Sequence, residues 1–369
     1  MGCGMDIFMK LSVVVPTFCE CENVPLLVGR LAAVLDPVLG ADGWEVVFVD
    51  DDSGDGTAEV VHGLALKDRR VRGILRVGRR GLAGACVEGM LAASGDFVAV
   101  MDADLQHDEK ILPQMLGILE RHEADVVVGS RYVEGGSAES FEGLRGVVSR
   151  FSGWLARVLL RVEVRDPMSG FFMLRRSALL GVVRRLSSQG FKILLDILAS
   201  GRGGLRVVEV PYVFGSRLHG ESKLDSLVMM DFLGLLVAKL TYDVVPVRFL
   251  LFSMIGAFGV LVHLLALKVA LTAGLMFALA QAAATVTAMT SNFWLNNRLT
   301  YRAQRLRGLG FVRGLLLAYA AWSFGAFANV GVAQWIYDHD SSWWLAGLAG
   351  ALVGSVWNYV VAGVLIWRR

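Results

Sequence analysis

The last third of the chain contains four long apolar stretches, and this feature most restricts what the chain can fold into. They cover approximately residues 247–274, 275–293, 311–337 and 343–367. A helix needs about 20 apolar residues to cross the roughly 30 Å hydrocarbon core of a bilayer. Because lipid offers no hydrogen bonds to the backbone, unbroken apolar segments of this length cross it as helices. We therefore predict an all-α transmembrane domain of four helices over residues 246–369.

Charge is distributed unevenly along the chain and predicts the orientation of these helices. Residues 245–369 contain nine Lys or Arg and two Asp or Glu, whereas the remaining residues contain 27 and 32. The basic residues of the tail gather on one side of the predicted spans, and they include Arg298, Arg302, Arg305, Arg307, Arg313, Arg368 and Arg369. Because positive loops stay in the cytosol, this side is expected to be cytosolic. An even number of spans then places both termini and the front of the chain in the cytosol.

A transitional segment, residues 224–245, separates the acidic front from the tail. It is apolar but broken by Asp225, Asp231, Lys239 and Asp243. This pattern indicates one or two amphipathic helices on the membrane surface. A buried helix of the front domain would show the same pattern. We therefore expect a cytosolic domain over residues 1–223, interfacial helices over 224–245 and the membrane domain over 246–369.

Short runs rich in β-branched residues alternate with segments of helical spacing in the front domain. The expected strands cover residues 11–15, 45–49, 73–77, 96–101 and 124–129. The expected helices cover residues 23–35 and 82–93, and a further helix opens at Gly56-Thr57. This alternation favours an α/β domain whose mainly parallel sheet is covered on both faces. Ligands of such sheets bind beyond the carboxyl ends of the strands, and the polar motifs of this chain fall there.

The motif Asp102-Ala103-Asp104-Leu105-Gln106 follows an apolar strand and is a candidate metal site. Mg²⁺ is usually held by one or two carboxylates together with substrate phosphates. Asp102 and Asp104 can supply these carboxylates, and Gln106 can add an amide oxygen. A D-x-D pattern alone also fits a solvated acidic turn. The second acidic strand end, Asp50–Asp52, favours the metal site.

The acidic run after the second expected strand has two interpretations. Asp51 is the candidate for hydrogen bonding to the base or ribose of a nucleotide. Asp55 precedes Gly56 at the start of an expected helix, where an aspartate commonly forms a turn or a cap.

Several motifs in a fixed order now point to a known family. They are Pro16–Glu20, Val49–Thr57, Asp102–His107, Gly129–Tyr132, Arg165–Phe171 and Gly220–Lys223. Together they resemble the family 2 glycosyltransferases of the dolichol-phosphate mannose synthase type, which have a Rossmann-like GT-A fold. The run Ser291–Tyr301 resembles the GtrA-like membrane domain that is fused to some of these enzymes. The chain departs from the family at Cys19, where asparagine is common, and at Phe18, where tyrosine is common.

The resemblance implies roles for particular residues. The nucleotide sugar would contact Pro16, Phe18, Glu20, Val49, Asp51, Asp102, Ala103, Asp104, Arg131, Arg217 and Lys223. A divalent cation, Mg²⁺ or Mn²⁺, would bind Asp102, Asp104 and Gln106. The acceptor phosphate would contact Arg131, Arg145, Ser149 and Arg217. Catalysis itself would depend most on Asp104, Arg131, Arg217 and Lys223. Arg145 is equally explained as a basic residue on a helix surface near the membrane.

The resulting hypothesis is a metal-dependent, inverting transfer of a hexose from a nucleotide diphosphate sugar to a polyprenyl or dolichyl monophosphate. An acceptor phosphate is already anionic at neutral pH and needs no general base. The resemblance favours mannose and GDP-mannose, with UDP-glucose next. The alternatives are a processive polysaccharide synthase, whose usual Gln-x-x-Arg-Trp motif is missing here, and a flippase or scaffold with a degenerate nucleotide-binding domain. The expected partners are the donor, the lipid acceptor and the bilayer, with no nucleic acid.

Overall fold

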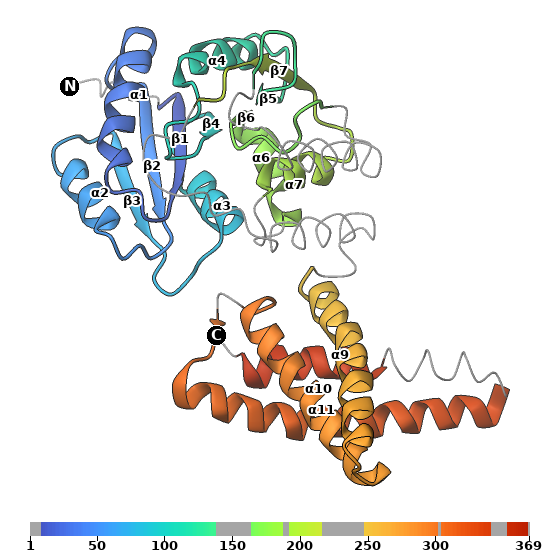
Figure 1. Cartoon of the computed structure of the whole chain (residues 1–369). Coiled ribbons are helices and arrows are strands. Elements are labelled where there is room, and N and C mark those ends of the chain that lie inside the picture. Colours follow the sequence, from blue (N-terminus) through green and yellow to red (C-terminus); the bar gives the residue numbers. More distant parts are fainter. Residues whose placement is uncertain are drawn as a thin grey trace, which may run out of the picture. The chain divides into compact units, whose positions relative to one another are not determined.

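The computed structural model describes residues 9–137, 164–186, 192–215, 247–301, 304–340 and 353–367. The chain divides into two compact units, Met1–Val244 and Val245–Arg369. The first is an α/β unit and the second is helical (Figure 1). The segment 224–245 lies outside the described residues, so its interfacial helices stay a prediction.

The α/β unit is built on one seven-stranded sheet with the strand order β3-β2-β1-β4-β6-β5-β7. The strands are β1 (Leu11–Thr17), β2 (Trp44–Asp50), β3 (Val71–Leu75), β4 (Phe97–Val100), β5 (Val126–Ser130), β6 (Phe172–Arg175) and β7 (Val207–Pro211). Strands β1 to β4 pair in parallel, as do β5 and β7. Strand β6 runs antiparallel between β4 and β5. The α/β class and the mainly parallel sheet predicted from the sequence are therefore confirmed.

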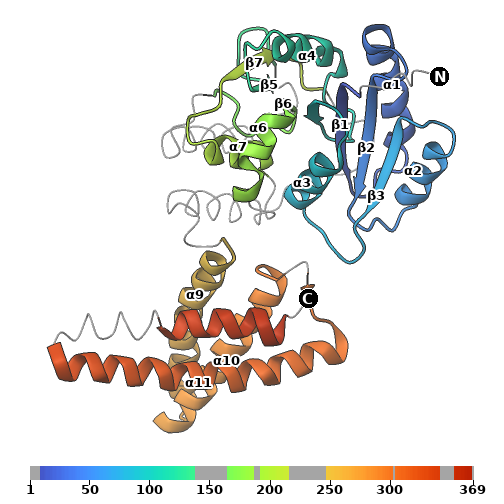
Figure 2. The same ribbon diagram turned by 180° about the vertical axis from the view of Figure 1, so that it is seen from behind.

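Helices cover both faces of the sheet because its central strands are apolar on both sides. On one face lie α1 (Asn23–Leu39), α2 (Thr57–Ala65) and α4 (Leu112–Glu120), and on the other lie α3 (Leu82–Ala92), α6 (Arg176–Val182) and α7 (Ile193–Ser200) (Figure 1). Figure 2 shows the same arrangement from behind. Alternate residues of β1 enter opposite cores: Val13 and Val15 pack with α1, and Val14 packs with α3.

The antiparallel direction of β6 determines what reaches the functional edge of the sheet. Phe172 pairs with Val100 of β4 on one side and with Val128 of β5 on the other. The segment leading into β6, residues 164–171, therefore enters at the edge where β4 and β5 end. A parallel strand in this position would bring its leading segment to the opposite edge.

Most expected elements differ from the structure by one or two residues at an end, and two differ by four residues in all. The helix expected over residues 23–35 extends to Leu39 and contains Pro37. The strand expected over residues 73–77 covers Val71–Leu75 instead, because its pairing with β2 begins at Val46–Val71. Strands β6 and β7 were not among the strands expected from the sequence.

The helical unit contains α9 (Val247–Thr272), α10 (Phe277–Arg298), α11 (Gly308–Asp340) and a helix over Val353–Ile366 that ends in a π-helical turn. Its core is aromatic: Trp367 stacks on Tyr301, with ring centroids 4.3 Å apart, and on Phe293, at 5.2 Å. Close helix contacts use glycine. A Cβ at Gly259 of α9 would overlap the side chain of Asn292 on α10.

One helix in the described residues, Arg248–Thr272, is long and apolar enough to cross a bilayer. Phe258, Leu261 and Leu265 on this helix are each more than half exposed. Side chains of this kind suit contact with lipid better than contact with water. The prediction of four spans is not settled by this helix and stays a prediction.

Candidate functional site

The polar motifs of the α/β unit lie at one edge of the sheet, where the parallel strands end. Asp51 follows β2, Asp102 and Asp104 follow β4, and Arg131 follows β5. Asp102 comes two residues after Val100, and Ser130 comes two residues after Val128. Because Val100 and Val128 flank the same residue of β6, Asp102 and Ser130 are level across the sheet.

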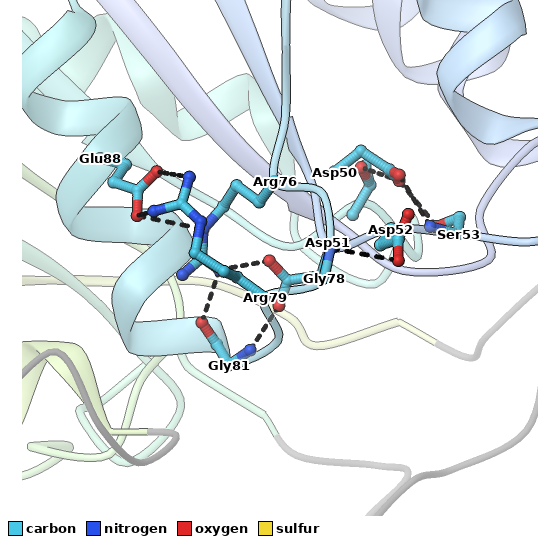
Figure 3. A network of polar contacts seen from close by, with 10 residues as sticks. Asp50, Asp51, Asp52, Ser53, Arg76, Gly78, Arg79, Gly81 and Glu88 are labelled. Atoms are coloured by element: carbon cyan, nitrogen blue, oxygen red, sulfur yellow. Dashed lines mark hydrogen bonds and ion pairs between the residues drawn. The ribbon is translucent and has the colours of Figure 1, made fainter. Parts of the chain in front are cut away.

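Asp51 belongs to a buried polar network at the end of β2 (Figure 3). Its carboxylate forms an ion pair with Arg76 and accepts a 2.6 Å hydrogen bond from the Gly81 amide at the start of α3. Arg76 also contacts Glu88, with Nε 3.2 Å from Oε1. The predicted nucleotide contact of Asp51 would therefore be made by a carboxylate that its own chain already holds in place.

The neighbouring aspartates are occupied in shaping the loop. Asp50 accepts hydrogen bonds from the Thr17 hydroxyl at 3.0 Å and from the Ser53 hydroxyl at 2.7 Å. Asp55 accepts bonds from the amide and hydroxyl of Thr57, at 3.1 and 2.6 Å, and thus holds the start of α2 as expected. Burial opposes the charged form of Asp55, but these hydrogen bonds outweigh it and lower its pKa to about 2.

Phe18 and Glu20 lie in the loop after β1, next to this acidic loop. The Arg80 guanidinium stacks over the Phe18 ring, 4.5 Å from its centroid. Arg80 also donates to the Asp52 carbonyl at 3.2 Å. The Glu20 amide donates to the Thr57 hydroxyl at 2.9 Å, which links the two loops. Arg80 thus adds an exposed cation that the sequence analysis did not single out.

Three further predicted positions contribute mainly through the backbone. Pro16 and Val49 are buried within β1 and β2, and Ala103 is buried between the two aspartates of the D-x-D motif. Their side chains carry no polar group, so any ligand contact would be with the main chain or by packing.

His107 organises the D-x-D loop. Its Nδ1 accepts a 3.1 Å hydrogen bond from the Asp102 amide, so the ring hydrogen of the neutral form is on Nε2. Nε2 lies 3.8 Å from Asp102 Oδ2. The ring stacks on Phe171 and contacts Tyr212 and Phe214. Burial in this aromatic cage lowers the pKa of His107 to about 4, so the imidazole is uncharged at neutral pH.

The predicted metal ligands provide oxygen atoms at this loop. The Asp102 side chain is 39% exposed, whereas Asp104 is buried. Gln106 donates its amide nitrogen to the Gly215 carbonyl at 2.9 Å, which leaves its amide oxygen for a cation. No three His, Cys, Asp or Glu side chains form a metal-binding group within the described ranges. Two carboxylates and an amide suit a hard cation that takes its other ligands from a phosphate.

Gly170 gives the Asp102 carboxylate room. A Cβ at this position would lie 2.9 Å from Asp102 Oδ2 and 3.3 Å from the His107 ring. The segment entering β6 therefore packs directly against the predicted metal loop.

Arg131 is held in a buried ion pair with Asp166. Nε and Nη2 donate to the two carboxylate oxygens at 2.7 and 2.8 Å, and the Arg131 amide donates to Oδ2 at 3.1 Å. Burial alone would lower the pKa of Arg131, but the Asp166 pair outweighs it and raises this pKa. A guanidinium has five N–H donors, so the donors not used by Asp166 can serve an anionic ligand.

Glu209 on β7 fixes the position of Asp166. Its carboxylate accepts hydrogen bonds from the Arg165 amide at 2.8 Å and from the Asp166 amide at 3.1 Å. Ser169 ties the same segment to β5, since its hydroxyl donates to the Gly129 carbonyl at 2.7 Å. A chain of contacts thus connects β7 to the Arg131 guanidinium.

Lys192 is a second cation near this centre that the sequence analysis missed. It is the residue before α7 and interacts electrostatically with Arg131, Asp102 and Asp166. Burial lowers the pKa of Lys192, and the Arg131 charge lowers it further. Its only signal in the sequence is a lysine directly before an apolar helix.

The structure brings together part of the predicted set. Asp102, Asp104 and Arg131 lie near one aromatic cluster, since Asp104 and Arg131 interact electrostatically with His107, and Asp102 and Arg131 with Tyr212. Gln106 is the residue before His107 in the same loop. Four predicted residues lie outside the described ranges: Arg145, Ser149, Arg217 and Lys223. Asp166, Glu209 and His107 were missed as site residues, although Asp166 and His107 lie within motifs that had been recognised.

Comparison with known proteins assigns both parts of the chain to known families. Residues 12–181 match the family described as Glycosyl transferase family 2, and residues 251–367 match the GtrA/DPMS transmembrane domain. The dolichol-phosphate mannosyltransferase of Pyrococcus furiosus is 35% identical over 362 residues, covering 97% of this chain and 99% of the relative. The Saccharomyces cerevisiae protein of the same name is 38% identical, covering 61% and 85%.

A crystal structure of glucosyl-3-phosphoglycerate synthase from Mycobacterium tuberculosis gives a TM-score of 0.47 at 20% identity, covering 63% of this chain and 80% of that one. The Pyrococcus furiosus relative, which matches nearly the whole chain, decides the family. The chain belongs to the dolichol-phosphate mannosyltransferase family and is a membrane glycosyltransferase, with a family 2 domain of GT-A fold followed by a GtrA/DPMS transmembrane domain.

Proposed function

We propose that this enzyme transfers mannose from GDP-mannose to a polyprenyl or dolichyl monophosphate at the cytosolic surface of a membrane. The observation that carries the proposal is the buried Arg131–Asp166 pair at the strand end beside the D-x-D loop. The guanidinium of this pair is held at the strand end, where it would meet an anionic acceptor beside the donor. The name of the Pyrococcus furiosus relative, which covers nearly the whole chain, supports the mannosyl donor and the lipid phosphate.

The donor would bind over the ends of β1, β2 and β4. Asp51, held by Arg76, would face the base or ribose, and Phe18 with Arg80 offers a flat surface and a positive charge beside it. The remaining proposed donor contacts are Pro16, Glu20, Val49, Asp102, Ala103, Asp104, Arg131, Arg217 and Lys223.

Asp102, Asp104 and Gln106 would hold a divalent cation, Mg²⁺ or Mn²⁺. When bound, such a cation neutralises the charge that grows on the departing diphosphate. The two carboxylates and the amide oxygen on the loop fit a cation that is shared with the substrate phosphates. His107 would act through Asp102 by fixing the loop.

The acceptor phosphate would be held by Arg131, with Arg145, Ser149 and Arg217 as further proposed contacts. An oxygen of this phosphate attacks the anomeric carbon, a new C–O bond forms, and the bond to the diphosphate breaks with its electrons going to the leaving nucleotide. No proton is removed from the acceptor, so no general base is needed. In-line attack inverts the anomeric carbon and gives a β-linked product from an α-linked donor.

The transmembrane domain would keep the enzyme beside its acceptor, whose tail lies in the bilayer. Confinement to one surface raises the effective concentration of the two partners. We propose four spans, with the catalytic domain and both termini in the cytosol.

The experiment is a transfer assay with the full-length protein, a short polyprenyl phosphate and a panel of donors that includes GDP-mannose and UDP-glucose. The product is identified by mass and by the anomeric coupling of its sugar. We expect a mannosyl lipid phosphate, no turnover after chelation of divalent cations, and no turnover in Asp104→Ala. A glucosyl product would replace GDP-mannose with UDP-glucose as the donor. A fully active Asp104→Ala enzyme would reject the metal role.

A further inference from the structure

The helical unit contains a pocket that the proposed sugar transfer does not use. It has a volume of about 430 Å³ and lies where α10 ends and α11 begins. Three arginines line it, Arg298, Arg305 and Arg307, together with the rings of Trp294 and Phe311.

The wall of this pocket is rigid because a buried asparagine holds it. Asn297 Oδ1 accepts hydrogen bonds from the Leu306 amide at 2.8 Å and from the Trp367 indole at 2.9 Å. Asn297 Nδ2 donates to the Leu306 carbonyl at 3.1 Å. Phe311 packs edge-on against Phe293, with ring centroids 5.0 Å apart. The segment that carries Arg305 and Arg307 is thus tied to both α10 and the end of the chain.

Among the described residues, no acidic side chain forms an ion pair with these three arginines. Asp338 and Asp340 are the only acidic residues in 245–369. They lie in the last turn of α11, about 45 Å from its first residue at 1.5 Å per residue. Arg298 instead stacks over the exposed ring of Trp294, 5.2 Å from its centroid.

The chemistry of the pocket fits a phosphate at a membrane surface. Guanidinium groups bind phosphate oxygens through paired N–H donors. Exposed tryptophan is typical of the headgroup level, and basic pockets between membrane helices bind acidic lipid headgroups. The pocket also includes Gly308, the first residue of the 33-residue helix α11, whose amide end favours an anion.

We propose that this pocket binds the phosphate group of an acidic membrane lipid, separately from the catalytic site. The lipid phosphate supplies negative charge to three arginines that have no ion-pair partner among the described residues. Two lipids carry this chemistry: a glycerophospholipid such as phosphatidylglycerol and a polyprenyl monophosphate.

The test measures lipid retained by the full-length protein in detergent, by native mass spectrometry, and does not depend on sugar transfer. Phosphatidylglycerol is compared with phosphatidylcholine. The polyprenyl monophosphate arm uses protein carrying Arg131→Ala, which weakens the proposed acceptor site, and binding is attributed to the pocket only where the pocket substitutions reduce it. The variants are Arg298→Gln, Arg305→Gln and Arg307→Gln. Arg313→Gln is the matched control, because Arg313 is exposed on α11 but does not line the pocket.

We expect saturable binding of at least one of the two acidic lipids, weakened about tenfold by each pocket substitution and less than twofold by the control. The lipid that binds in this way, phosphatidylglycerol or the polyprenyl monophosphate, is the source of the phosphate. Equal retention of phosphatidylcholine, or an equal loss in Arg313→Gln, would mean unspecific surface charge and would overturn the proposal. So would the failure of both acidic lipids to bind, which would point to a carboxylate of another part of the chain as the counter-ion.

Discussion

The Asp166 carboxylate accepts two hydrogen bonds, of 2.7 and 2.8 Å, from the Arg131 guanidinium, and both side chains are buried. Removing one partner of a buried pair leaves the other charge uncompensated and costs about 3–5 kcal/mol. We expect Asp166→Asn to lower the thermal midpoint clearly and to reduce transfer about a hundredfold, since a misplaced guanidinium no longer meets the acceptor.

The matched control for this substitution is Asp125→Asn. Asp125 pairs with Arg206, whose side chain is 58% exposed, so its loss should cost less than about 1 kcal/mol. Similar melting and similar turnover in the two variants would show that the buried pair has no special role.

Glu209→Gln tests whether β7 positions the Arg131 guanidinium from a distance. The glutamate accepts two backbone amides with two oxygens, whereas glutamine has one acceptor oxygen. We expect the KM for the lipid acceptor to rise about tenfold while the KM for the donor stays unchanged. Steady-state kinetics with each substrate varied in turn measures this split, and Glu209→Asp should restore part of the loss. An equal change in both KM values would indicate general damage to the fold.

Gly170→Ala should weaken cation binding without changing the fold. The new methyl group would lie 2.9 Å from Asp102 Oδ2 and would push that carboxylate aside. Changes to the surroundings of metal ligands typically lower metal affinity 10–100-fold. The Mn²⁺ concentration for half-maximal activity should therefore rise about tenfold or more. Gly181→Ala is the control, because a Cβ there meets nothing within 4 Å.

The pH dependence of stability can be tested at Glu45, far from the site at the start of β2. Burial would raise the pKa of this carboxyl group, but hydrogen bonds from Arg72, Ser12 and the Ser94 amide outweigh it, and the pKa lies below its usual value of 4.5. Because the folded state has the lower pKa, the stabilisation is complete above pH 4.5 and is lost as the pH falls below it.

We therefore expect Glu45→Gln to have a lower melting temperature than the wild type at pH 7, because the substitution costs about 1–3 kcal/mol of unfolding free energy. The difference between the two proteins should become smaller below pH 4.5. Thermal unfolding of both proteins between pH 3.5 and 7 measures this difference in stability. Glu134→Gln, at an exposed loop position, should leave both curves unchanged. A gap that widens at low pH would contradict the argument.

The fold could be predicted where local pattern and tertiary structure agree. Runs such as Val13–Val15 are β-branched and are buried on both faces, so they read as central strands. Strand β6 could not be predicted, because its four residues become a strand only by pairing with β4 and β5 on either side. The C-terminal end of α1 was not predicted correctly: Pro37 suggests that the helix breaks there, but the helix continues to Leu39.

The site could be predicted to the level of motifs but not of contacts. Asp102 and Arg131 follow apolar strands, and this was visible in the sequence. That Asp166 pairs with Arg131, or that Glu209 holds Asp166, depends on segments 35 and 43 residues apart and leaves no local signal. The predicted roles of Arg217 and Lys223 stay predictions, since both lie outside the described residues.

The antiparallel insertion of β6 also has a consequence for substrate choice. Two strand spacings, about 10 Å in total, separate the backbones of β4 and β5. The distance between the acidic turn and the guanidinium is therefore set by the pairing of the strands and not by flexible side chains. This fixed distance constrains only the polar head groups of the two substrates, which must come together at this edge of the sheet. Isoprenoids of different length would pass equally well, and any selection among them must be made by other parts of the protein.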